Sequence, residues 1–255
     1  MTATALTELT TKATMFDEDM LPTPPDVSHL ITEDDTPVDN LFSEKQMRLL
    51  AESLYTSWSG PGEGRTFLVM ANVGLFSTPH QPALVPDVLL SLDVRPPENL
   101  FPKEHRSYFI WEYGKPPEVI VEIVSNRKGG ELGNKLLDYA RMGISYYVVY
   151  DPEGHISEPP LRLFARQGAH FAETTDAWLD TVGLGLVLWE GEYEGASTIW
   201  LRWCNQVGEL YATGAEALAL AQQKIGQERQ NTEHERQRAE QMAARLRALG
   251  IDPDA

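Results

Sequence analysis

Cysteine and long apolar runs are nearly absent from this chain of 255 residues. Its one cysteine, Cys204, cannot form an intrachain disulfide, and such sparse cysteine usage is typical of a reducing compartment. No apolar run approaches the roughly 18 residues that a membrane-spanning helix requires. Residues 1–20 have neither a basic start nor an apolar stretch, which argues against a signal peptide. We therefore expect a soluble, cytoplasmic protein with no membrane partner.

Positive charge is also scarce. The chain has 21 Lys and Arg against 38 Asp and Glu, a net charge of −17, of which residues 1–40 carry −8, residues 41–210 carry −8 and residues 211–255 carry −1. Proteins that bind nucleic acid tightly and non-specifically usually have a basic surface that neutralises phosphates. The composition therefore argues against high-affinity non-specific binding of nucleic acid, but it does not exclude a small local basic site.

Several well-known catalytic motifs are missing. None of the six histidines lies three or four residues from another, so no zinc motif is present. The sequence also has no glycine-rich phosphate loop and no nucleophile elbow. These absences exclude the common zinc, phosphate-loop and serine-hydrolase signatures.

The composition divides the chain into three parts. Residues 1–40 are rich in Thr, Asp and Pro with few large apolar residues, which predicts a flexible acidic tail, with an extended arm lying on the domain as the alternative. Residues 41–205 have the patterns of a folded α/β domain. Residues 206–255 are helical by composition and form a C-terminal helix.

Within the domain, a helix is predicted from Ser43 to Trp58, because apolar residues recur every three or four positions. A second helix is predicted over 131–142, ended by Gly143. Strands are predicted at 66–76, 83–94, 118–125, 144–152, 161–166, 170–174 and 181–191. The strand, helix and strand between 118 and 152 are typical of a βαβ unit with parallel strands. Three indoles are expected to pack the terminal helix onto the sheet: Trp189, Trp200 and Trp203.

The terminal helix has a heptad pattern. Its seam positions are Leu218, Ala221, Ile225, Glu228, Thr232, Glu235, Ala239, Met242, Leu246 and Leu249. The middle of this seam is polar, which weakens it. The pattern predicts either a coiled coil that makes a homodimer or a solvated single helix, and the sequence leaves both open.

Two acidic residues interrupt apolar strands. Asp87 lies in LVPDVLLSL and Glu122 in VIVEIV, where a buried carboxylate is costly unless it is paired, protonated or bound to a metal. Either residue alone could make a strand-end salt bridge. If the two strands pair, however, both carboxylates can point into one pocket, and their mutual repulsion favours a hard divalent cation such as Mg²⁺.

Basic residues follow Glu122 along the chain. Lys135 lies on the predicted helix, with Tyr139 one turn later on the same face. A lysine beside two metal-bound carboxylates can balance their charge and orient a water molecule, whereas the alternative is an ordinary surface lysine. Arg127 and Lys128, in the loop before that helix, are candidates for contacting a phosphate or are simply solvated.

Three segments carry a resemblance to a known family: PDVLL at 86–90, PPEVIVEIVSNRKGGELGNKLLDYARMGISYYVVYDP at 116–152, and the C-terminal LRALGIDPD. Between about Phe42 and Trp200 the chain resembles the Uma-type family of restriction endonuclease-like proteins, a branch of the PD-(D/E)XK nuclease superfamily. The resemblance implies an α/β fold of mixed sheet, a PD-(D/E)XK core with flanking helices, to which this chain adds a long C-terminal helix.

The resemblance also implies roles for individual residues. Asp87 and Glu122 would bind Mg²⁺ or Mn²⁺ together with the backbone carbonyl of Ile123, and Lys135 would position water. Val124 stands where the superfamily pattern has lysine, which implies that the lysine has moved to the next helix. An acidic residue of the first helix sometimes joins such sites, and the candidates here are Glu44 and Glu52.

The expected function is metal-dependent hydrolysis of phosphodiester bonds by an endonuclease, with DNA as the substrate. Val124 and the acidic composition favour an alternative, a catalytically inactive nuclease fold that acts through its coiled-coil tail. Asp87, Glu122 and Lys135 favour the enzyme. A metal-dependent phosphodiesterase acting on a small substrate is the third possibility, because an acidic surface would tolerate such a substrate better.

Overall fold

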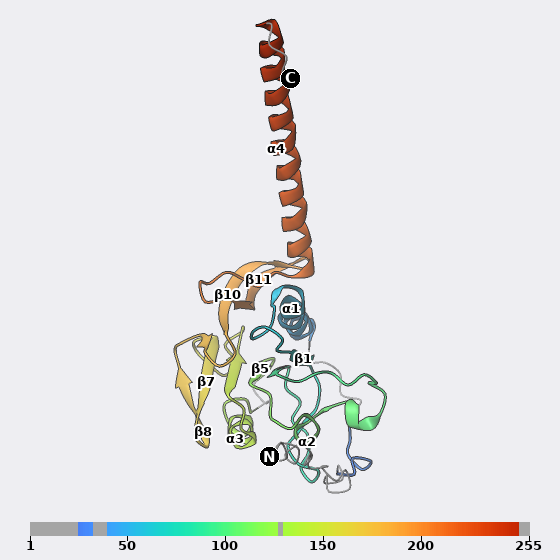
Figure 1. Cartoon of the computed structure of the whole chain (residues 1–255). Coiled ribbons are helices and arrows are strands. Elements are labelled where there is room, and N and C mark those ends of the chain that lie inside the picture. The colour runs from blue at the N-terminus through green and yellow to red at the C-terminus, as the bar shows by residue number, and fades with distance from the viewer. Residues whose placement is uncertain (1–24, 33–39, 127–129, 250–255) are drawn as a thin grey trace, which may run out of the picture.

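The computed structural model describes residues 25–32, 40–126 and 130–249, which form a layered α/β domain and a long C-terminal helix, α4 (Gly214–Ala248). Figure 1 shows α4 extending away from the domain as a single rod. In these described ranges, none of the helices is both long and apolar enough to cross a membrane.

The central sheet has six strands in the order β1-β3-β5-β6-β7-β8. Their bounds are Phe67–Ala71 for β1, Val88–Leu92 for β3, Val119–Ile123 for β5, Tyr146–Tyr150 for β6, Leu161–Gln167 for β7 and His170–Thr174 for β8. In this sheet only β5 and β6 pair in parallel, and helix α3 (Asn134–Met142) connects them. This is the predicted βαβ unit, and Gly143 ends its helix in the left-handed conformation.

The segment predicted as one strand over 66–76 is divided in the structure. Asn72 takes a positive φ of 54°, which turns the chain after β1. The next strand, β2 (Leu75–Phe76), leaves the central sheet and pairs in parallel with β4 (Tyr108–Phe109). The 3-10 helix η2 (Lys103–His105) precedes β4, and the short helix α2 (Ile110–Tyr113) follows it.

A second sheet lies against the first and has the order β11-β10-β9. Its strands are β9 (Trp178–Leu179), β10 (Leu184–Tyr193) and β11 (Ala196–Cys204). Glu194 and Gly195 join β10 to β11 with φ values of 47° and 77°, as a two-residue hairpin turn requires. Strand β11 was not predicted from the sequence, because its residues do not alternate clearly between apolar and polar.

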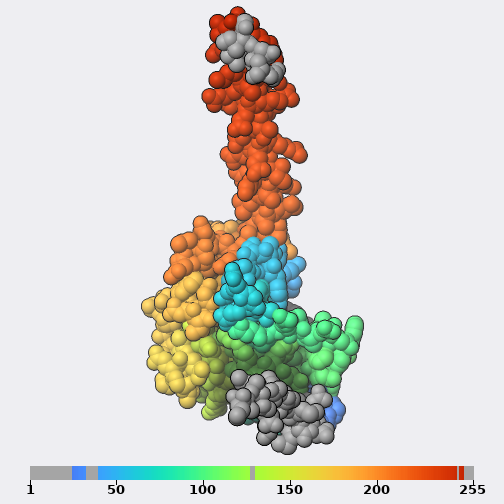
Figure 2. Space-filling model, viewed as in Figure 1, coloured from blue at the N-terminus to red at the C-terminus, as the bar shows by residue number. Residues whose placement is uncertain are grey.

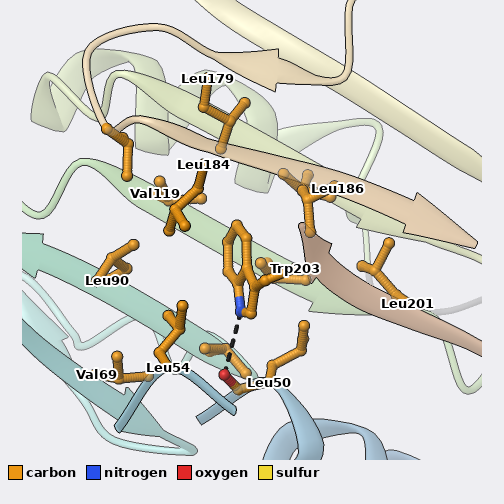
Figure 3. Close-up of a cluster of buried hydrophobic side chains, with 14 of the residues drawn as sticks. Leu50, Leu54, Val69, Leu90, Val119, Leu179, Leu184, Leu186, Leu201 and Trp203 are labelled. Atoms are coloured by element: carbon orange, nitrogen blue, oxygen red, sulfur yellow. Dashed lines mark hydrogen bonds between the residues drawn. The ribbon is translucent and has the colours of Figure 1, made fainter. Parts of the chain in front are cut away.

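Helix α1 (Leu41–Ser57) packs one face of the central sheet together with β10 and β11. Trp203 lies at the centre of this core, and its indole N–H donates to the carbonyl of Leu50 over 3.1 Å (Figure 3). Trp200 stacks on Phe42 at the start of α1. These two indoles therefore pack against the first helix, and the prediction that they hold the terminal helix was wrong. The β10–β11 hairpin buries the faces of both indoles, and α4 begins only after this hairpin.

The other face of the central sheet is covered by α3 and by the β2–β4 pair. Part of the N-terminal segment also adds to the core, since Val27 and Leu30 are buried against Phe76 and Phe109. Within residues 25–32 the chain thus lies on the domain, as the extended-arm alternative expects. Figure 1 shows α1 and α3 on opposite sides of β5.

Candidate active site

Asp87 and Glu122 lie side by side on the α3 face of the central sheet. Val88 pairs with Val121 across antiparallel β3 and β5, and the same register continued by one residue sets Asp87 opposite Glu122. An Asp87 carboxylate oxygen accepts a hydrogen bond of 2.6 Å from the backbone N–H of Ile123. The pairing of two short apolar strands is therefore what brings the two acids together.

Glu122 is almost fully enclosed, with 2% of its surface exposed. One of its oxygens accepts a hydrogen bond of 2.8 Å from the Lys135 ammonium, and the other accepts one of 2.6 Å from the Tyr139 hydroxyl. Both donors come from one face of α3, one turn apart. The helix that connects β5 to β6 thus supplies both partners of the buried carboxylate.

The surroundings make the negative charge of Glu122 unfavourable. Burial is the largest effect, and with the nearby charge of Asp87 it raises the pKa of Glu122 to about 7. The Lys135 charge and the hydrogen bonds from Lys135 and Tyr139 lower the pKa, but they do not offset burial. Burial therefore outweighs the attraction of Lys135, and Glu122 binds a proton more readily than an exposed glutamate does.

Lys135 remains a cation in this setting. Burial alone lowers the pKa of its ammonium, but the charge of Glu122 and the hydrogen bond to it have a larger opposite effect, so the net pKa lies above the ordinary value. A quarter of the side chain is exposed. Lys135 therefore presents a fixed positive charge to the site on a side that solvent, and hence a substrate, can reach.

Glu131 is a third acid at the site, and it was not among the site residues predicted from the sequence. Only 7% of its surface is exposed, and one carboxylate oxygen lies 3.5 Å from the Lys135 ammonium. The other oxygen is buried and has no hydrogen-bond partner. The sequence did contain a signal for Glu131. It lies four residues before Lys135, and residues at that spacing share one face of a helix.

The donor set fits a hard divalent cation. Mg²⁺ is commonly held by one or two carboxylates and several waters, and Asp87 and Glu122 supply two carboxylates on one face. The N–H and C=O of a strand residue point to the same side, so the carbonyl of Ile123 also faces the strand of Asp87. A group of three or more His, Cys, Asp or Glu side chains suited to a metal does not occur among the described residues. Backbone and water oxygens would complete the coordination.

Neither acid proposed from the first helix reaches this site. Glu44 pairs with Arg48 on the surface of α1, and Glu52 accepts hydrogen bonds from the Tyr193 hydroxyl and the backbone of Gly214. The reason is topological, because α1 packs on the sheet face opposite to Glu122.

Val124 is buried in the apolar core beneath α3, so the position where the superfamily pattern has lysine is filled by a hydrocarbon side chain. The ammonium that contacts Glu122 comes instead from Lys135 on the next helix. Arg127 and Lys128, the proposed phosphate contacts, lie outside the described residues.

The elements and contacts above define an α/β protein with a mixed, mostly antiparallel sheet and an acidic site on its α3 face. The sequence profile of the Uma2 family, described as "Putative restriction endonuclease", matches residues 33–185, more than half of the chain. The chain therefore belongs to the Uma2 family, and its restriction-endonuclease-like fold confirms the class expected from the sequence. No curated protein and no solved structure matched the chain.

Proposed function

We propose that this protein is a metal-dependent endonuclease that hydrolyses phosphodiester bonds of DNA. The observation that carries the proposal is the contact of the Lys135 ammonium with buried Glu122, directly beside Asp87. A buried ion pair is often no more stabilising than apolar side chains of the same volume, so stability alone does not explain these charges in the sheet, and a chemical role does. The family description supports the same class of reaction. The single cysteine is consistent with a place in the reducing cytoplasm.

The proposed roles follow from the contacts. Asp87 and Glu122 would hold Mg²⁺ or Mn²⁺, which when bound polarises a phosphoryl oxygen and lowers the pKa of a coordinated water. Tyr139 fixes the orientation of Glu122 by donating to it. Lys135, a cation with an exposed side, would position the attacking water and stabilise the negative charge that develops on the phosphate.

A second candidate is a phosphodiesterase that acts on a small substrate at the same site. The net charge of −17 favours it, because a long polyanion meets more repulsion from an acidic protein than a small phosphodiester does. Both candidates use the same residues. The two candidate functions differ in the substrate, because DNA must lie along the protein surface whereas a small phosphodiester need not.

Supercoiled plasmid and a small chromogenic phosphodiester, each with Mg²⁺ or Mn²⁺, test and separate the two candidates. The variants Asp87→Asn and Lys135→Met should each abolish cleavage, as should EDTA. Lys45→Met is the matched control, since Lys45 pairs with Glu194 away from the site, and it should retain full activity.

Cleavage of plasmid that both variants and EDTA abolish would support the endonuclease. Cleavage of the small diester alone would instead support the second candidate. Cleavage that persists in Asp87→Asn would come from a contaminant or from another site. No cleavage of either substrate, with no binding of Mg²⁺, would favour an inactive nuclease fold.

A further inference from the structure

Helix α4 leaves the domain after its first turn. Its start is fixed by Arg202 of β11, which makes two hydrogen bonds to the carboxylate of Glu216 and one to the carbonyl of Tyr211. Glu52 of α1 accepts from the backbone of Gly214 at the same point. Beyond this junction the helix projects as a rod, which Figure 2 shows rising from the domain.

Such a helix has little to stabilise it alone. Most helical stability in proteins comes from packing of an apolar face, and isolated helices are marginal in water. Gly226, in the middle of α4, lowers the intrinsic preference for helix further. The length of α4 therefore indicates that another surface covers it.

Most of the exposed large apolar residues of α4 lie on the heptad seam, whereas Leu220, 61% exposed, lies off it. Leu218 is 59% exposed, Ile225 50%, Met242 68% and Leu249, directly after the helix, 75%. They occupy the two ends of the seam, while its middle holds Glu228, Thr232 and Glu235. The seam therefore has two apolar ends and a polar centre.

The seam of one α4 helix complements the seam of a second α4 helix that runs in the opposite direction. In a parallel pair Glu228 would face Glu228, and Glu235 would face Glu235, which places like charges in the seam. In an antiparallel pair centred between residues 233 and 234, Glu228 faces Ala239 and Glu235 faces Thr232. The ends then match as well, since Leu218 meets Leu249 and Ile225 meets Met242.

We propose that α4 is a dimerisation element in which two copies of this chain pair antiparallel along the seam. A second copy is the occupant because the order of apolar and acidic positions along α4 is self-complementary only in that orientation. At 1.5 Å per residue, the seam from Leu218 to Leu249 is about 47 Å long. The two nuclease-fold domains therefore lie at opposite ends of this rod, each beside the C-terminal end of the other helix. The pairing does not depend on whether the site is catalytic.

Light scattering coupled to gel filtration tests the association on the full chain. We expect twice the chain mass for the wild type and the single-chain mass for Ile225→Asp. Gln230→Asp is the matched control, because position 230 lies on the face opposite the seam, and it should remain a dimer. A wild type that stays monomeric at 100 μM or so, well above a Kd of about 1 μM, overturns the proposal, as does a dimer that Ile225→Asp leaves intact.

Cysteine cross-linking tests the orientation. Cys204 is buried, so the wild type is the background control. A mixture of Leu218→Cys and Leu249→Cys chains should form a cross-linked heterodimer on mild oxidation, whereas neither variant alone should cross-link. Cross-linking of Leu218→Cys with itself would show a parallel pair and overturn the antiparallel arrangement. Far-ultraviolet circular dichroism and unfolding of the domain, measured on each variant, separate loss of pairing from loss of folding.

Discussion

At the scale of single residues, the surroundings of Glu122 determine the properties of the site. Its carboxylate has two donors, Lys135 and Tyr139, yet burial beside Asp87 leaves its pKa near 7. An ion pair with a purely structural role would be more stable if the negative charges of the carboxylates were balanced by positive charges. A divalent cation beside the two carboxylates would favour the ionised form of Glu122, so the same surroundings are relevant to the raised pKa and to the proposed chemistry.

Glu122 should make stability depend on pH. Because its pKa in the folded protein, about 7, lies above the ordinary value of 4.5, the native state keeps a proton that the unfolded state loses. The free energy of unfolding therefore falls as pH rises from about 4.5 to 7, and the loss is complete above that range. Glu122→Gln should lack this decline, so its stability relative to the wild type should increase across the same window. Urea unfolding of both proteins in EDTA would measure it, and parallel pH profiles would contradict the assignment.

Tyr139→Phe should weaken metal binding without unfolding the protein. Its hydroxyl favours the ionised form of Glu122, and loss of such an outer-shell partner typically weakens metal affinity about 10- to 100-fold. Calorimetric titration with Mn²⁺ would give the affinity. Tyr150→Phe is a suitable control, because that hydroxyl donates to Ile199 away from the site, and its Mn²⁺ affinity should equal that of the wild type. Equal affinities in all three proteins would exclude a role for Tyr139.

At the scale of helices and strands, the parts with a strong local pattern were predictable. The β-branched run of β5, the helix ended by Gly143 and the apolar run of β6 gave the βαβ unit directly from the sequence. The break at Asn72 and strand β11 were not predicted. Asn72 has no local signal that distinguishes a turn from a strand interior, and β11 is defined mainly by its pairing with β10.

The candidate site was predictable to a similar degree. Asp87 and Glu122 stand out because an acidic residue within an apolar segment rarely has a purely structural role. Lys135 was predicted because it lies on the helix that follows Glu122. Glu44 and Glu52 were wrong candidates because the sequence does not reveal which sheet face α1 covers. Glu131 was missed because it lies in the turn before α3, and its burial depends on how that turn packs in the folded protein.

The contact between α1 and β11 should contribute strongly to stability. Gln46 is fully buried, and its side-chain amide pairs with both the N–H and the C=O of Leu201, as a neighbouring strand would. Gln46→Ala leaves both backbone groups without partners and should lower the free energy of unfolding by about 2–4 kcal/mol. Urea unfolding would measure this change. The exposed control Gln206→Ala should change stability by less than about 0.5 kcal/mol, and an equal effect in both would refute the role given to Gln46.

At the scale of the whole molecule, the acidic charge limits how DNA can be bound. A net charge of −17 allows contact with few phosphates, in contrast to proteins that hold DNA by broad neutralisation. If DNA is the substrate, its binding must come from a small local surface around Lys135 and from the metal.

Binding of DNA should therefore depend only weakly on salt. Each phosphate neutralised contributes about −0.9 to the slope of log affinity against log salt, and we expect a slope shallower than about −4. Fluorescence anisotropy with a labelled duplex, in Ca²⁺ to suppress cleavage, would give this slope. A slope steeper than about −8 would show an extensive basic interface and contradict this view of the surface.

The central claim is that Asp87 and Glu122 form one metal site, and direct titration with Mn²⁺ tests it without any assumption about substrate. We expect one Mn²⁺ per chain in the wild type, displaced by Mg²⁺. In Asp87→Asn the loss of affinity should exceed the roughly 10- to 100-fold typical of outer-shell changes. The control Asp138→Asn, on the exposed side of α3, should bind as the wild type does. Absence of a saturable site in the wild type, or equal binding by Asp87→Asn, would contradict the account.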